Sequence, residues 1–246
     1  MIISDPTIYF LILILGAFVA AFVTGAVGFA DGLIFNAFWL HIMDPIAAVQ
    51  LVIVASLIVH LQPLYKLRQE LNYTRLRPFA FFGIVGVPLG IALLIYSQPA
   101  LFKAGVGVLL LTYGVWMLGK SGNTLIGKSK KVTDSFVGFV GGVMGGFSGI
   151  GGLLPTIWMN LQNENKNTQR GTYEPFILFI NIAGITGFVI AGKITESVFS
   201  DLLVIMPALM IGSWLGIKIY PKLNEVLFRK IVLGCILLSG LGLLVI

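Results

Sequence analysis

The chain has 246 residues, of which 57% are hydrophobic and 11% are charged, and its net charge is +6. Soluble domains contain roughly 25% charged residues, so this composition excludes an ordinary water-soluble protein and indicates a polytopic helical membrane protein. The single cysteine, Cys235, excludes an intramolecular disulfide framework and a multi-cysteine metal site.

The first predicted element is a retained N-terminal segment, because residues 1–10 contain Asp5 but no basic region of the kind found in a cleaved signal peptide. Apolar runs of about twenty residues can cross the hydrocarbon core as helices. In chain order we expect a hairpin at 8–42, helices at 46–61, 79–96 and 101–118, a basic linker at 121–133, a second hairpin at 136–161, and helices at 176–191, 202–220 and 228–246. The predicted fold class is therefore an all-α polytopic membrane protein.

The two halves of the chain resemble each other in sequence. Three pairs of segments align in the same order: Phe18–Phe35 with Phe139–Thr156, Gly86–Ile91 with Gly212–Ile217, and Leu101–Gly114 with Leu227–Gly240. Apolar residues match easily by chance, but these matches are collinear and share glycine positions. We therefore expect an internal duplication, with repeats at 1–120 and 134–246.

The positions of the basic residues predict how the chain is oriented. Lys and Arg are concentrated in the loops 62–78, 119–133 and 218–230, and cytoplasmic loops carry the excess of such residues. All three loops fall on one side only if each half crosses the membrane an odd number of times, which makes the repeats inverted. We predict three crossings and one re-entrant hairpin per half; two short crossings in place of each hairpin satisfy the same parity. The N-terminus is then external, and the protein is expected in the cytoplasmic (inner) membrane.

Glycine-rich stretches interrupt both hairpins, at "TGAVGFADG" (24–32) and "GGFSGIGG" (145–152). Non-helical backbone at membrane depth is tolerated where protein or a water-filled cavity receives its polar groups, so we expect two part-length helices in each hairpin. Helix N-termini and freed N–H groups favour anions. The predicted substrate-binding residues at the two breaks are Gly28, Ala30, Asp31, Gly32, Ser148, Gly149, Gly151 and Gly152. The alternative is close helix packing through small-xxx-small patterns such as Gly142-xxx-Gly146.

Four further polar residues extend this hypothesis. Asn36 and Tyr173 are predicted to offer uncharged hydrogen bonds to an oxyanion. Asp31 and Glu174 are predicted to carry a coupling proton or ion, because an intramembrane carboxylate is usually functional. The alternatives are that Asp31 caps the second helix of its hairpin, and that Glu174, beside Pro175, complements the dipole at the start of the following helix.

The remaining charged candidates are expected near the membrane surfaces. Arg170 is interpreted as a solvated loop charge, with attraction of anions at the inner mouth as the alternative. His60 precedes a basic loop and His41 precedes Asp44, so both are expected near interfaces, with a proton relay as the alternative role.

The paired openings "GAVGFADG" and "GGFSGIGG", the helices "GVPLGI" and "GSWLGI", and the eight-segment layout resemble the TauE/SafE sulfite exporter family of membrane permeases. The likeness covers nearly the whole chain. It implies transport of a small sulfur-containing or organic anion, such as sulfite, thiosulfate, a sulfonate or sulfoacetate, coupled to an ion gradient. Gly149, Gly151 and Gly152 match the family's glycine cluster, whereas Ala30 and Asp31 stand in the corresponding places of the first copy.

Taken together, the patterns predict a secondary transporter that works by alternating access around a midplane site where the two breaks meet. Its expected partners are the anion, the lipid bilayer and a coupling proton or cation, but no nucleic acid; monomer and homodimer both remain open. A passive anion channel and a transporter of a non-sulfur carboxylate are the alternatives. Two histidines and one cysteine, far apart in sequence, argue against an intramembrane enzyme, and we expect no cofactor and no metal.

Overall fold

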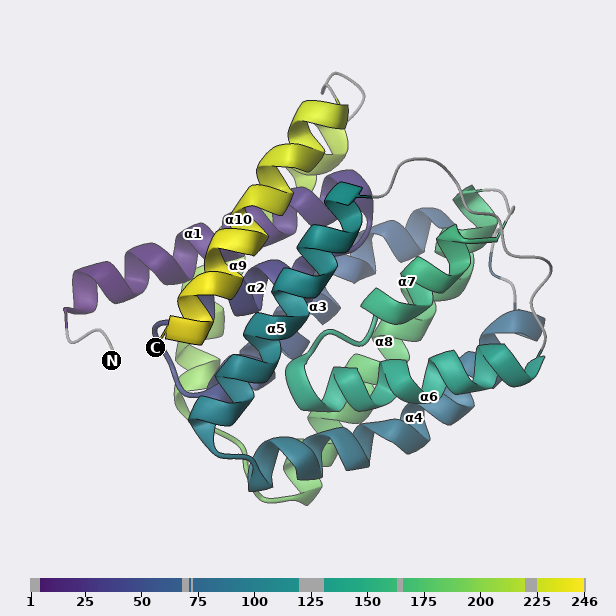
Figure 1. The fold of residues 1–246 in the computed structure, drawn as a ribbon, viewed down its shortest axis with the longest axis horizontal. Helices are drawn as coiled ribbons and strands as arrows, with labels where there is room; N and C mark the ends of the chain where they lie inside the picture. Colours follow the sequence, from purple (N-terminus) through teal and green to yellow (C-terminus); the bar gives the residue numbers. More distant parts are fainter. Residues whose placement is uncertain are drawn as a thin grey trace.

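The computed structural model describes residues 5–67, 71, 73–119, 131–162, 166–219 and 225–245. Within these ranges the chain is all-helical, without a β-strand (Figure 1). The helices are α1 Pro6–Val27, α2 Asp31–Trp39, α3 Pro45–Leu67, α4 Tyr73–Tyr96, α5 Pro99–Gly119, α6 Lys131–Ser148, α7 Leu153–Asn160, α8 Lys166–Ile190, α9 Ser197–Ile219 and α10 Glu225–Val245. The predicted all-α class is confirmed.

Five of the described helices are long and apolar enough to cross a membrane: α1, α4, α5, α8 and α9. The apolar stretches of α3 and α10, Pro45–Leu61 and Ile236–Val245, are shorter. Large apolar side chains such as Phe81, Phe199 and Leu238 point outward and are 65 to 73% exposed. Soluble monomers rarely expose extended apolar surface, so this exterior fits a lipid environment and a multi-pass membrane protein.

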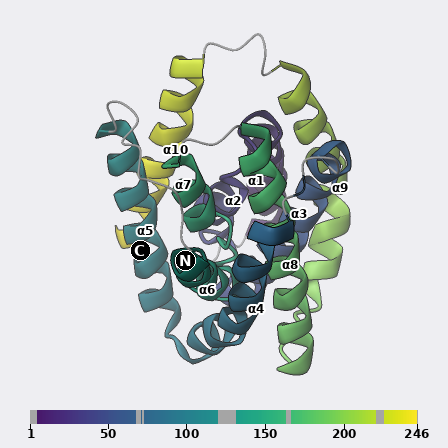
Figure 2. The ribbon, with the colours of Figure 1, turned by 90° about the vertical axis from the view of Figure 1, so that its right-hand side faces the viewer.

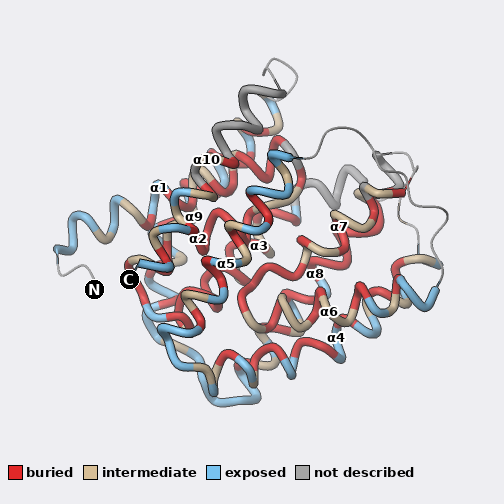
Figure 3. The backbone as a smooth tube through the Cα atoms, viewed as in Figure 1, coloured by how far each residue is buried: buried red, intermediate tan, exposed pale blue. Residues whose placement is uncertain are grey.

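Helices from the two halves of the chain pack against each other in pairs. α1 runs along α9, α4 along α6, and α5 along α10, while α3 and α8 meet in the interior. α5 and α10 lie together on one side of the molecule and α9 lies on the opposite side (Figure 2). Burial is concentrated in the inner helices, and eight of the nine residues of α2 are buried (Figure 3). The N-terminus of α2 therefore lies inside the protein.

Glycine allows two of these pairs to pack at backbone contact. A Cβ added at Gly142 of α6 would overlap the carbonyl oxygen of Gly83 on α4, and one added at Gly216 of α9 would overlap that of Phe22 on α1. This is the close packing that small-xxx-small patterns produce between membrane helices. The packing interpretation thus holds for Gly142 and Gly146, whereas the break begins only after Ser148.

Three helices differ from the expected extents. α1 has 22 residues and is long and apolar enough for a full span, rather than being a part-length helix. α8 begins at Lys166 instead of near residue 176, so Pro175 lies inside the helix. The sequence-based expectation treated proline as a helix start, but membrane helices tolerate interior proline because neighbouring groups satisfy the freed carbonyl. Pro78 lies inside α4 in the same way, so α4 begins at Tyr73 and not at 79.

Candidate functional site

The first break separates α1 from α2. Gly28 closes α1 with a 2.7 Å hydrogen bond from its N–H to the Thr24 carbonyl, and it has a φ of +87° that favours glycine. Ala30 adopts a φ of +83°, the only positive φ of a non-glycine residue in the described part of the chain. The first backbone hydrogen bond of α2 runs from Ile34 N–H to the Ala30 carbonyl, so the preceding N–H groups of this turn have no backbone partner within the helix.

The second break separates α6 from α7. Gly149 N–H donates to the Gly145 carbonyl at 2.9 Å, and Gly149 then turns the chain out of α6 with a φ of +72°. α7 starts at Leu153, and its Thr156 N–H donates to the Gly152 carbonyl at 3.1 Å. Both glycine-rich stretches therefore interrupt the helices as predicted, each through a left-handed residue directly after the first helix.

The two breaks touch each other in the interior. The Asn36 amide Nδ2 donates to the Gly32 carbonyl at 2.6 Å and, across the breaks, to the Ser148 carbonyl at 2.8 Å. A Cβ added at Gly32 would lie 2.8 Å from the carbonyl oxygen of Gly149. Asn36 is fully buried, so this side chain fixes the two openings relative to each other.

A small cavity lies between the breaks. About 10 Å³ of it is open to the centre of a water molecule, which is room for about one water. Its lining includes Ala30, Asp31, Gly32, Ser56, Gly149, Ile150 and Gly152. Five of the predicted site residues thus line one space.

The other predicted site residues do not line this cavity. Gly28 faces Arg170, and Gly151 packs against Gly145 and Ile180. The Ser148 hydroxyl donates to the Met144 carbonyl of its own helix, 3.0 Å away. Tyr173 is buried on α8.

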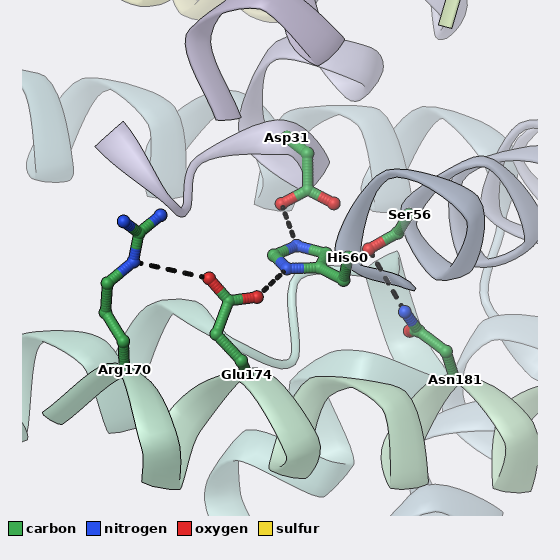
Figure 4. Close-up of polar contacts among 6 residues, drawn as sticks. All are labelled: Asp31, Ser56, His60, Arg170, Glu174 and Asn181. Carbon is green, nitrogen blue, oxygen red and sulfur yellow. Dashed lines mark hydrogen bonds and ion pairs between the residues drawn. The ribbon is translucent and has the colours of Figure 1, made fainter. Parts of the chain in front are cut away.

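A row of ionisable side chains adjoins the cavity (Figure 4). His60 of α3 lies between two carboxylates: its Nε2 is 3.3 Å from Asp31 Oδ1 of α2, and its Nδ1 is 2.5 Å from Glu174 Oε2 of α8. The other Glu174 oxygen, Oε1, is 3.6 Å from Arg170 Nε, one helical turn away. Asp31, His60 and Glu174 are buried, whereas the Arg170 side chain is 32% exposed. Burying three ionisable groups is costly, which makes this row a functional candidate.

This geometry corrects four expectations. Ala30, not Asp31, is the cap residue of α2 and makes no side-chain capping bond; Asp31 is the first helical residue and faces His60. Glu174 is not at a helix start, because α8 begins at Lys166. Arg170 is not a loop charge but a helical residue beside Glu174. His60 is fully buried rather than at an interface.

His60 is the member of this row for which the sequence favoured an interfacial position, with a proton relay only as the alternative. It is the one ionisable residue in the predicted apolar span 46–61, and an intramembrane ionisable residue is by default a functional candidate. His41 is separate from the row, and its Nε2 lies 3.2 Å from the Ser239 hydroxyl of α10.

Neighbouring polar residues tie the surrounding helices together. Asn181 Nδ2 of α8 donates to the Ser56 hydroxyl of α3 at 3.0 Å, next to the row. Gln50 of α3 donates to the Lys193 carbonyl at 2.6 Å and accepts from Thr195 N–H.

Within the described residues, no group of His, Cys, Asp and Glu has the arrangement of a metal site.

A comparison with known families matches residues 13–243 to the family described as sulfite exporter TauE/SafE. Searches of curated proteins and of solved structures gave no match to this chain. The matched range includes both breaks and the whole ionisable row. The chain therefore belongs to the TauE/SafE sulfite exporter family, a family of membrane transporters.

Proposed function

We propose that this protein is a secondary transporter that moves a small sulfur-containing or organic anion across the cytoplasmic membrane, coupled to a proton. One observation carries the proposal: the two glycine breaks, one from each half of the chain, meet in the interior directly beside a buried carboxylate–histidine–carboxylate row. The membership of the TauE/SafE family supports sulfite, thiosulfate or a sulfonate as the class of substrate.

The breaks supply the donors that an oxyanion needs. N–H groups in the first turn of α2 have no backbone partner within the helix, and the positive end of its dipole lies inside the protein. Gly149 and Gly152 bring backbone from the opposite break to the same cavity. Backbone donors of this kind recognise charge and size rather than a particular side-chain shape, which suits a small oxyanion.

The small size of the cavity supports a mechanism in which the site opens and closes. Room for about one water is too little for sulfite or thiosulfate, so binding and release require the walls to move apart. Alternating access by rocking of one half against the other meets this requirement. The helix pairing supports two repeats related by an approximate two-fold axis, because exchanging the two halves maps the α1–α9 pair onto α6–α4, and maps α3–α8 and α5–α10 onto themselves.

Coupling follows from the charges beside the site. Asp31 lines the cavity, and an ionised carboxylate repels an anion at short range, most strongly where water is excluded. A proton held by Asp31, His60 or Glu174 removes one negative charge from the row when the substrate enters. Proton and anion are then favoured in the site together, which is the thermodynamic basis of coupled transport.

A thermal-shift screen of the purified protein tests the substrate class. Sulfite, thiosulfate, methanesulfonate and acetate are compared with chloride at equal ionic strength and at two pH values. The proposal predicts that sulfur oxyanions raise the unfolding temperature more than chloride, and more strongly at the lower pH. Stabilisation by acetate alone would replace the substrate class with carboxylates, and no stabilisation by any oxyanion would contradict an anion site.

A further inference from the structure

The Arg170 side chain lies across the first break. A Cβ added at Gly28 would be 2.8 Å from Arg170 Nε and 2.9 Å from its Cζ, so the guanidinium packs on the backbone of the left-handed turn. The side chain is 32% exposed, yet its Nε is buried and has no hydrogen-bond partner. Arg170 therefore combines a fixed positive charge, an unused donor at the break and access from outside the protein.

Glu174 is held more tightly by His60 than by Arg170. Its Oε2 is 2.5 Å from His60 Nδ1, whereas its Oε1 is 3.6 Å from Arg170 Nε and has no hydrogen-bond partner. A charge-assisted N–H···O bond is normally about 2.7–2.9 Å long, so the Arg170–Glu174 pair is a loose one. A second anion with well-placed oxygens could compete with Glu174 for the guanidinium.

The charges around this pair do not attract an anion by themselves. Asp31 from α2, His60 from α3, and Arg170 and Glu174 from α8 face one another (Figure 4). The Tyr173 phenol of α8 also interacts with Arg170 and Glu174. With His60 protonated, the two cations and two carboxylates sum to zero; with His60 neutral, the sum is −1. These groups therefore balance each negative charge of a bound anion only by taking up one proton.

We propose that Arg170 binds the transported oxyanion, and that Glu174 competes with the anion for the Arg170 guanidinium until a proton delivered by His60 neutralises the Glu174 carboxylate. This inference rests on the proposed transport function and names its binding residue. A proton from the side of Asp31 adds to Nε2 of the neutral His60 imidazole, and the Nδ1 proton crosses the 2.5 Å hydrogen bond to Glu174 Oε2, so that the imidazole ends neutral with its proton on Nε2. Glu174 becomes a neutral carboxylic acid, and the guanidinium fork can then donate to two oxygens of the anion.

The test measures the affinity of the full-length purified protein for thiosulfate, whose charge is constant near neutral pH, at an acidic and an alkaline pH. Wild type is expected to bind more tightly at the acidic pH. Arg170→Gln is expected to weaken binding about tenfold or more at both, as befits a lost charge-assisted hydrogen bond. Arg170→Lys keeps the charge but loses the guanidinium fork, so its affinity for thiosulfate should lie between those of wild type and Arg170→Gln.

Glu174→Gln is expected to strengthen thiosulfate binding at alkaline pH, whereas Arg170→Gln weakens it. Because the amide cannot compete as an anion, the variant should bind at alkaline pH as tightly as wild type does at acidic pH, with no remaining pH dependence. A purely structural role for Glu174 would weaken binding at both pH values and would overturn the proposal. So would unchanged thiosulfate affinity in Arg170→Gln.

Controls separate the possible failures. The double variant Arg170→Gln/Glu174→Gln removes both charges and tests binding without a buried unpaired carboxylate; it should bind as weakly as Arg170→Gln. Arg75→Gln removes another arginine that pairs with a buried carboxylate, Asp134, at 3.3 Å, and should keep wild-type affinity. If wild type binds no sulfur oxyanion, the proposed function itself fails; if wild type binds but Arg170→Gln binds equally well, only this inference fails.

Discussion

Substitution of Gly149 by alanine perturbs the second break at a single atom. Gly149 has a φ of +72°. A residue with a Cβ is destabilised by about 1–2 kcal/mol in this left-handed conformation. The added Cβ would also lie 2.5 Å from Val52 Cγ1 and 3.1 Å from Val52 Cβ. Overpacking of a tight interior costs about 1–3 kcal/mol. We therefore expect Gly149→Ala to lower the free energy of unfolding by about 2–5 kcal/mol.

Gly192 provides a matched control in the turn between α8 and α9. It has a φ of +61°, but nothing lies within 4 Å of an added Cβ. Gly192→Ala should therefore lower the free energy of unfolding only by the cost of the left-handed conformation, about 1–2 kcal/mol. The difference between the two alanine variants then reports the overlap with Val52. In the double variant Gly149→Ala/Val52→Ala that overlap is absent, although the buried valine leaves a cavity of its own.

Both variants are measured by unfolding of the purified protein in detergent and by anion uptake into proteoliposomes. Gly149→Ala should insert into the membrane, unfold more easily than Gly192→Ala and transport far more slowly, because the break lines the proposed site. Gly192→Ala should transport at close to the wild-type rate. Equal stability of the two variants, together with wild-type uptake by Gly149→Ala, would refute the conformation and the role assigned to this break.

Three further stability predictions use the same unfolding measurement. Asn36→Ala removes two buried hydrogen bonds, one of them to the Ser148 carbonyl, and should destabilise the protein by about 1–3 kcal/mol; an unchanged unfolding midpoint would mean that the two breaks are held together by other contacts. Gly142→Ala should destabilise by about 1–3 kcal/mol or more, because its Cβ would overlap the Gly83 carbonyl and force α4 and α6 apart. Gly105→Ala, with open space around the added Cβ, should instead stabilise by about 0.5–1 kcal/mol through helix propensity, and a loss of stability there would argue against the placement of α5.

The glycine breaks could be predicted from sequence because their signal is local. Seven glycines between Gly141 and Gly152 cannot all serve a regular helix, and the same interruption recurs in the first half of the chain. The structure divides their roles by position: Gly142 and Gly146 permit close packing against α4, whereas Gly149 makes the turn. Sequence alone could not make this division, because it depends on which neighbouring helix lies against each glycine.

The ionisable row could be predicted only in part, for the same physical reason. Asp31 stands out as a carboxylate within an apolar run, Glu174 directly precedes one, and Arg170 is one helical turn before Glu174. His60, however, comes from a different helix and meets both carboxylates only because α3 packs between α2 and α8. Its proximity to a basic loop in sequence suggested a surface position, and only the tertiary packing shows that its side chain points inward.

Uptake of thiosulfate into proteoliposomes under an imposed pH gradient tests the central claim most directly. A proton-coupled transporter should show saturable uptake whose initial rate changes with the size of the gradient, and which reverses when the gradient is reversed. Flux that rises linearly with thiosulfate concentration and ignores the pH gradient would contradict coupled transport and identify a passive anion channel.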